Sequence, residues 1–221
     1  MSAVIRNGVY VQYGCGLCAP TGWLNFDASA RLRLERMPLS RTLVRKTVGA
    51  IFPRNVLPGD IVRGLPIRDN SAVAVYSSHC LEHLPRGDVP TALNNTFRML
   101  GGGGVFRLIV PDLQWRALRY VAALENGSMP ADDFLGSCHL GQWTRPKTWL
   151  KFVIDRYKRS DHLWMYDFPT FKGLLEAAGF SSVRRCQFGD AADPMFAQVE
   201  DVNRFVDQGH KELAIEAVKA A

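Results

Sequence analysis

Two glycines and a carboxylate near the start of the sequence have the types and spacing of a nucleotide-binding site. The turn Gly14–Gly16 directly follows an alternating, β-rich run, Val9–Tyr13, so it stands at the end of a predicted strand. Glycine lets the backbone approach a ligand closely and adopt positive φ. Asp27 ends the next predicted strand, Trp23–Asp27, and its carboxylate can accept hydrogen bonds from both hydroxyls of a ribose. These residues predict a pocket for a nucleoside.

The spacing disfavours a dinucleotide. Dinucleotide sites normally show three glycines in the pattern G-x-G-x-x-G at the start of a helix, with an acidic residue about 20 residues further on. Here the third glycine is missing, and Asp27 follows Gly16 by only 11 residues. Residues 17–22 leave no room for a helix N-terminus that could hold a diphosphate.

The elements around these residues alternate between strands and helices. We expect helices within 29–52 and at Asp88–Leu100 and Phe168–Gly179, and further strands near Asp60–Val62 and at Ala72–Tyr76, Val105–Val110, Val183–Phe188 and Glu212–Val218. Such alternation predicts an α/β fold with a mainly parallel sheet flanked by helices. Ligands bind at the carboxyl ends of the strands in such sheets. The Gly14 turn, Asp27, Asp60, Ser77–His79 and Asp112 should therefore converge on one crevice.

Composition sets the broad class. The chain has 221 residues, 47% of them hydrophobic, which suits one globular domain over residues 1–221. Four of the five tryptophans fall within 113–165, a stretch that we expect to be a small helical lid or substrate wall. No apolar run approaches the roughly 20 residues of a membrane span, and the first residues do not resemble a secretory signal. We therefore expect no membrane association and a cytoplasmic location.

The cysteines and the net charge indicate which kinds of partner the chain has. The five cysteines are scattered and odd in number, so we expect free thiols, including Cys15 and Cys18 of the C-x-x-C pattern. The net charge of +6 is spread along the chain, with the densest group from Arg31 to Lys46. We interpret it mainly as a solvated surface, which argues against nucleic acid as a partner.

Five motifs in order resemble the class I, Rossmann-like S-adenosylmethionine-dependent methyltransferases. They are Tyr13–Gly16, Gly22–Asp27, Gly64–Ser71, Tyr76–Leu84 and Arg98–Arg107, and the resemblance covers about residues 9–188. More narrowly, the chain is similar to a bacterial subgroup with a short first helix and a later His-x-Trp-Met-Tyr-Asp, here His162–Asp167. It departs from the family at Ala72 and Val73, where Phe and Asp are usual, and at Gly101–Gly102, where Lys-Pro is usual.

The resemblance implies S-adenosylmethionine as the cofactor and assigns its contacts. Gly14, Cys15 and Gly16 would line the methionine part, Asp27 would hold the ribose, and Asp60 and Ile61 would flank the adenine. Ser77, Ser78 and His79 would close the other side, with Tyr13 and Asn25 among the remaining cofactor contacts.

The segment His79-x-x-Glu82-His83 also matches the inverted zinc-protease pattern H-x-x-E-H. We expect no bound metal here: Glu82 and His83 would pair with neighbours at a helix start, and His79 would face the cofactor. A metallohydrolase built on these three residues stays open as an alternative.

For catalysis, methyl transfer to an oxygen needs positioning and removal of a proton, for which histidine is well suited. His162 is the first candidate base, with Tyr166 and Asp112 to orient it. We expect O-methylation of a small metabolite, a saccharide or secondary metabolite, by a monomer or homodimer. The alternatives are a methyltransferase acting on RNA or peptide, and a non-catalytic protein that binds S-adenosylmethionine.

Overall fold

The computed structural model describes residues 8–37, 51–126, 130–141, 161–207 and 209–221. Its strands are β1 (Val9–Tyr13), β2 (Leu24–Asp27), β3 (Val56–Pro58), β4 (Ala72–Ser78), β5 (Leu100–Pro111), β6 (Phe180–Arg185), β7 (Val206–Asp207) and β8 (His210–Lys219). Its helices are α1 (Ala30–Arg36), η1 (Leu81–His83), α3 (Val89–Met99), α4 (Leu113–Leu124), α5 (Pro130–Ser137), α7 (Phe168–Ala177), η2 (Pro194–Gln198) and α8 (Val202–Phe205).

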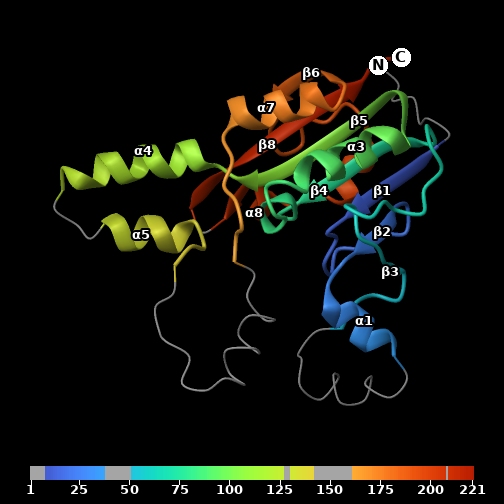
Figure 1. The fold of residues 1–221 in the computed structure, drawn as a ribbon, viewed down its shortest axis with the longest axis horizontal. Coiled ribbons are helices and arrows are strands. Elements are labelled where there is room, and N and C mark those ends of the chain that lie inside the picture. Colours follow the sequence, from blue (N-terminus) through green and yellow to red (C-terminus); the bar gives the residue numbers. More distant parts are fainter. Residues whose placement is uncertain (1–7, 38–50, 127–129, 142–160, 208) are drawn as a thin grey trace.

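The strands form one mixed sheet in the order β3-β2-β1-β4-β5-β8-β6, with β7 paired to the side of β8 (Figure 1). Strands β1 to β5 pair in parallel, and β8 runs antiparallel between β5 and β6. The predicted Rossmann-like α/β fold is confirmed. The strand order reverses between β1 and β4, which is where open α/β sheets bind ligands.

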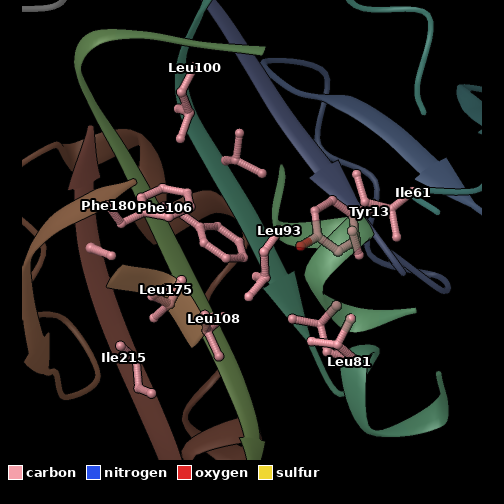
Figure 2. Close-up of a cluster of buried hydrophobic side chains, with 14 of the residues drawn as sticks. Tyr13, Ile61, Leu81, Leu93, Leu100, Phe106, Leu108, Leu175, Phe180 and Ile215 are labelled. Carbon is pink, nitrogen blue, oxygen red and sulfur yellow. The ribbon is translucent and has the colours of Figure 1, made fainter. Parts of the chain in front are cut away.

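One face of the sheet packs against α3 and α7. Figure 2 shows part of this cluster, in which Phe106 and Leu108 of β5 lie among residues of α7, β6 and β8. The ring of Tyr13 belongs to the same cluster, beside Ile61. Apolar side chains of β1, β4 and β5 point toward this side of the sheet. Their contacts with α3 and α7 hold the helices on the sheet.

The other face is covered by residues that come much later in the chain. Tyr10 and Trp23 pack with Phe196 and Phe205, which belong to η2 and α8. The Tyr10 hydroxyl donates to Asp193 Oδ2 (2.9 Å), and Trp23 Nε1 donates to the Met195 carbonyl (3.2 Å). Residues 14–23, which connect β1 to β2, form turns and contain no helix. The segment after β6 therefore takes the place on this face that a β1–β2 helix would fill.

Two predicted strands are displaced. The strand expected near Asp60–Val62 is β3, which ends at Pro58, and residues 61–63 form a turn. The strand expected at Val183–Phe188 is β6, which begins at Phe180 because Gly179 (φ +98°) ends the preceding helix and the Phe180 ring is buried against Phe106.

The glycine run Gly101–Gly104, expected as a helix stop before the next strand, is part of β5. The pairing with β4 skips these residues, since Ala72 pairs with Leu100 and Ala74 with Val105. A Cβ on Gly104 would lie 2.8 Å from the carbonyl oxygen of Gly101, so this compact bulge requires glycine.

Two helices, α4 and α5, project away from the sheet (Figure 1). Asp112 caps α4 by accepting from the Trp115 amide (3.2 Å), and Asp167 caps α7 in the same way.

Of the helices expected within 29–52, α1 is seen and residues 38–50 lie outside the described residues. None of the helices in the described part of the chain has the length and apolarity needed to span a membrane.

Candidate active site

A cavity of about 460 Å³ lies at the carboxyl ends of β1 and β4. Its floor includes Gly14 and Cys15 from the glycine turn, and Tyr76 and Ser78 from the end of β4. Its far wall is residues 199–202 and Arg204, from the segment that covers this face of the sheet. The size suits a small ligand or cofactor.

The glycine turn adopts the left-handed backbone that its sequence predicts. Gly14 has φ +66°, and a Cβ there would lie 2.6 Å from the Cβ of Cys80. Gly16 has φ +54° but faces open space. The turn is tied to β2, because the Gly16 amide donates to Asp27 Oδ2 (3.0 Å) and the Cys15 amide to the Phe26 carbonyl (3.1 Å).

Asp27 has little surface left exposed, and each of its oxygens accepts one backbone hydrogen bond. Oδ2 accepts from Gly16, and Oδ1 accepts from the Ser29 amide at 2.8 Å. An ionised carboxylate has about four acceptor positions. Asp27 can therefore hold the turn and still accept hydroxyl groups of a ligand.

Asn25, predicted as a cofactor contact, is fully buried and bonds to the protein. Its Nδ2 donates to the carbonyls of Pro20 (3.0 Å) and Trp23 (2.9 Å), and its Oδ1 accepts from Gln12. Gln12 also donates to the Cys18 carbonyl (2.8 Å). These two amides fix the β1–β2 connection, so Asn25 can act on a ligand only through the shape of that loop.

The end of β4 carries hydroxyls that the protein leaves unsatisfied. The side chains of Tyr76, Ser77 and Ser78 are buried at their oxygens, and none makes a hydrogen bond of normal geometry with a described residue. Burial raises the pKa of Tyr76 well above its usual range, by more than the neighbouring Ser78 hydroxyl lowers it. Buried hydroxyls without partners fit a polar ligand in the cavity that Tyr76 and Ser78 line.

The other predicted cofactor contacts lie near the cavity but do not all line it. Tyr13 lines it, although its ring points into the core, where Thr96 donates to the phenol oxygen (3.3 Å). Asp60 follows β3 and accepts from the Val62 amide (2.9 Å), and Ile61 is buried in the core. The described residues that line the cavity do not include these two, nor the other predicted contacts Gly16, Asn25, Asp27, Ser77 and His79.

The far wall was not predicted from the sequence. Glu200 has a buried side chain and pairs with Arg107 of β5 (2.6 Å), which also contacts Asp190 and Glu216. Arg204 offers its carbonyl to His79 Nε2 (3.1 Å). No local pattern in residues 186–205 signals this role, because it depends on packing against strands more than 100 residues earlier.

The three predicted catalytic residues take different places. The Asp112 carboxylate caps α4 and accepts from Arg185 Nη1 (3.1 Å). Tyr166 is buried, its ring is 4.8 Å from Phe171, and its backbone pairs with that of Asp112. Burial raises the pKa of its phenol to about 12, and no described residue hydrogen-bonds to it.

His162 lies in a cluster with Glu82 and two further histidines. Its ring centroid is 5.2 Å from that of His83 and 4.8 Å from that of His139. Burial lowers the pKa of His162 to about 4, against the opposing effect of Glu82. The ring is therefore neutral at neutral pH.

The H-x-x-E-H segment forms the short helix η1 and its approach. His79 Nδ1 lies 3.4 Å from Glu82 Oε1, and His83 Nε2 lies 3.9 Å from the same oxygen. Burial lowers the pKa of His79, but the hydrogen bond and charge of Glu82 outweigh it and leave this pKa raised. Both His79 nitrogens thus face protein atoms, Glu82 on one side and the Arg204 carbonyl on the other.

A second cavity, of about 470 Å³, lies between α4, α5 and the start of β8. Aromatic, basic and acidic side chains line it, among them Trp115, Arg119, Tyr120, Asp132, Asp133, His139 and His210. The ring of Trp115 meets His210 edge-on at 5.3 Å. Trp164 is 47% exposed, and Trp143 and Trp149 lie outside the described residues.

A comparison with protein families finds a match, which lies within the first half of the chain. Residues 11–108 match the family model described as a methyltransferase domain. No curated protein sequence matches the chain.

Among solved structures, the chain is similar to a SAM-dependent methyltransferase of Thermotoga maritima, a possible histamine N-methyltransferase, with 17% identity and a TM-score of 0.51 over 98% of this chain and 84% of that one. It is also similar to a SAM-dependent methyltransferase of Archaeoglobus fulgidus, with 17% identity and a TM-score of 0.49 over 96% and 86% of the two chains. The likeness to the Thermotoga protein shows a shared fold.

Proposed function

We propose that this chain, whose residues 11–108 match the family model of a methyltransferase domain, is a class I, S-adenosylmethionine-dependent methyltransferase that methylates an oxygen of a small metabolite, a saccharide or a secondary metabolite. The protein is an enzyme, and S-adenosylmethionine is its cofactor. Within the proposal, residues 1–221 are a single domain in which 113–165 act as a lid.

The cavity at the ends of β1 and β4 carries this proposal. Its left-handed glycine turn brings backbone close to a ligand, and the hydroxyls of Tyr76 and Ser78 have no described partner. These groups suit the methionine part of the cofactor, whose ammonium and carboxylate need hydrogen-bond partners. Asp27 has acceptor positions left for the ribose hydroxyls.

The other cofactor contacts of the proposal are assigned around this cavity. We assign the main chain of Tyr13, Gly14, Cys15 and Gly16 to the methionine part, and Ser77, Ser78 and His79 to its opposite side. Asp60 and Ile61 would flank the adenine beyond Asp27. Asn25 would act by holding the β1–β2 connection in shape.

The chain's own contribution to the chemistry is to place the acceptor. When bound, the cofactor supplies a methyl group on a positively charged sulfur. The transfer requires the acceptor oxygen in line behind that methyl group, so holding both partners accounts for much of the rate. We propose His162 as the group that handles the acceptor proton, with Tyr166 and Asp112 as positioning residues. A ring with a pKa near 4 is a weak base, so this role is a small part of the proposed rate.

The second cavity supports a small acceptor. Its volume is that of a site for one small molecule, and it combines the rings of Trp115 and Tyr120 with the carboxylates of Asp132 and Asp133. Flat aromatic faces and carboxylates suit the apolar faces and hydroxyls of a saccharide. An RNA or peptide substrate would instead favour a continuous basic surface reaching this cavity.

Calorimetry with S-adenosylhomocysteine tests the cofactor site. The wild-type chain should bind one equivalent, and Asp27→Ala should weaken binding about tenfold or more, since a hydrogen bond to a charged group is worth about 1.5–3 kcal/mol. Asp133→Ala, in the second cavity, is the matched control and should keep the wild-type affinity. Absence of binding by the wild type would refute the cofactor site, and an unchanged Asp27→Ala affinity would refute the ribose assignment.

The acceptor proposal is tested by turnover with panels of hydroxylated small molecules, RNA and peptides. Methylation confined to RNA or peptide would refute it. His162→Ala with unchanged turnover would remove His162 from proton handling.

A further inference from the structure

Glu82 is a buried carboxylate without the donors that such a group requires. Its side chain has no exposed surface, and it makes no hydrogen bond of normal geometry with a described residue. The two nearby histidine nitrogens, His79 Nδ1 at 3.4 Å and His83 Nε2 at 3.9 Å, both face Oε1. A buried charge is strongly destabilising unless it is paired or coordinates a metal. The ion pair with His79 leaves Oε2 without a partner among the described residues, and a bound cation would complete the pairing of this carboxylate.

The imidazoles of His83 and His162 lie close to Glu82, and one ring nitrogen of His83 is held in place by the backbone. His83 Nδ1 lies 3.1 Å from the carbonyl oxygen of Asp161, which requires the proton on Nδ1 and leaves the lone pair of Nε2 directed toward Glu82. His162 Nδ1 is buried without a hydrogen-bond partner in the described part of the chain. A backbone bond that fixes one ring nitrogen while the other is free is the usual arrangement of a metal-binding histidine.

We propose that Glu82, His83 and His162 bind one divalent transition-metal cation. One potential ligand atom from each of these residues lies within 4.8 Å of the other two. Ligand atoms about 2.1 Å from one such cation are about 3.4 Å from one another in a tetrahedral site, so side-chain shifts of up to about 1.4 Å would close the site. Two imidazoles and a carboxylate suit Zn²⁺, Fe²⁺ or Co²⁺, whereas Mg²⁺ and Ca²⁺ prefer oxygen ligands.

The proposed site differs from two expectations from the sequence. A metal-free cluster was expected, and the alternative placed zinc on His79, Glu82 and His83. In the structure His79 lies between Glu82 and the Arg204 carbonyl, and the third ligand position belongs to His162, 80 residues beyond Glu82 (162 − 82). Three protein ligands leave coordination positions open, as in metal sites that bind a substrate.

The location indicates what the open positions would bind. His79 follows Ser78 and contacts Arg204, both of which line the cofactor cavity. On the other side, His139 lines the second cavity and its ring is 4.8 Å from that of His162. A cation between the two cavities would orient an oxygen of the acceptor. Because His162 would then have its lone pair on the cation, metal binding would take the place of the proton-handling role proposed for His162. The orienting of the acceptor rests on the proposed methyltransferase function, whereas metal binding itself does not.

Titration of the chelator-treated full chain with Co²⁺ and with Zn²⁺ tests the site. The wild type should bind one equivalent of each, with visible Co²⁺ absorption bands, and Glu82→Gln and His162→Ala should each weaken binding at least tenfold. His210→Gln is the matched control, because it changes a histidine of the second cavity outside the cluster. It should bind like the wild type.

Thermal melting separates lost ligands from lost folding. Without metal, Glu82→Gln should melt at or above the wild-type temperature, because it removes a buried charge, and added Zn²⁺ should raise the melting temperature of the wild type but not of Glu82→Gln. S-adenosylhomocysteine binding should be the same with and without these substitutions, which keeps the two proposals distinguishable. Failure of the wild type to bind either metal, or unchanged binding by Glu82→Gln and His162→Ala, would overturn the site.

Discussion

Replacing Arg107 by Met should destabilise the protein through the wall of the cofactor cavity. The Arg107 side chain is 1% exposed, and its guanidinium contacts Glu200, Asp190 and Glu216 at 2.6, 2.9 and 2.6 Å. Burial acts to lower its pKa, but Cys186 and the surrounding carboxylates raise it overall, so the group is a cation at all accessible pH values. Met keeps the apolar stem and removes the charge.

The size of the effect follows from what is left behind. Glu200 would remain buried without its cation, a change that typically costs about 3–5 kcal/mol. The Gly189 amide still donates to Glu200 Oε2 (3.2 Å), and Asp190 is exposed enough to be hydrated. We therefore expect the lower end of the range, about 3 kcal/mol. In a chain of 221 residues each kcal/mol shifts the melting temperature by about 2–4 °C, so it should fall by about 6–12 °C.

A double-mutant cycle tests the reasoning. Glu200→Gln in the Arg107→Met background removes the stranded charge and should recover at least half of the loss, measured by urea denaturation and thermal melting. S-adenosylhomocysteine affinity should follow the same order, because Glu200 lines the cavity. A loss below about 1 kcal/mol for Arg107→Met, or additive effects in the double variant, would refute the assigned role of this ion pair.

Three further predictions concern the turn, a thiol and a helix cap. Gly14→Ala should lower both stability and S-adenosylhomocysteine affinity more than Gly16→Ala, because both positions have positive φ but only the first meets Cys80; equal losses would show that this contact is unimportant. Cys18 is the exposed cysteine and lines the cofactor cavity, so S-adenosylhomocysteine should slow its modification by a thiol reagent, and an unaffected rate would count against this location. Asp167→Ala should cost about 1 kcal/mol as a lost N-cap. Because hydrogen bonds in the first turn of α7 lower the pKa of Asp167, the wild-type advantage over Asp167→Ala should be complete at neutral pH and disappear as the pH falls through that lowered pKa, which melting curves between pH 7 and pH 3 would show.

The parts of the fold that could be predicted are those with a local cause. The strands observed at Val9–Tyr13 and Ala72–Ser78 could be predicted because each begins as an apolar run. The run is followed by residues that break a strand or cap a helix. The helix at Val89–Met99 was identified from its apolar face. The left-handed turn at Gly14 and Gly16 follows from residue type, since only glycine adopts positive φ without strain.

The rest depends on contacts between distant segments. Nothing near Glu200 indicates that it meets Arg107, and nothing near His162 indicates that it meets Glu82. His162 and Tyr166 are one helical turn apart in the sequence, but this stretch is not helical. Asn25 is a contact implied by the resemblance, and its bonds to the connection after β1 cannot be known without coordinates.

The far wall of the cofactor cavity comes from residues near the end of the chain, and this has a consequence for biosynthesis. Trp23 and its partner Met195 are 172 residues apart in the chain, and a ribosome adds about 5–20 residues per second. For roughly ten to thirty seconds the nascent chain carries Tyr10 and Trp23 on an uncovered apolar face. During that interval the first strands can neither close the cofactor cavity nor cover this apolar face. We therefore expect ribosome-associated chaperones to bind the nascent chain there. Ribosome profiling with crosslinked chaperones would detect that interval as a period of binding that ends once residues 194–205 have emerged.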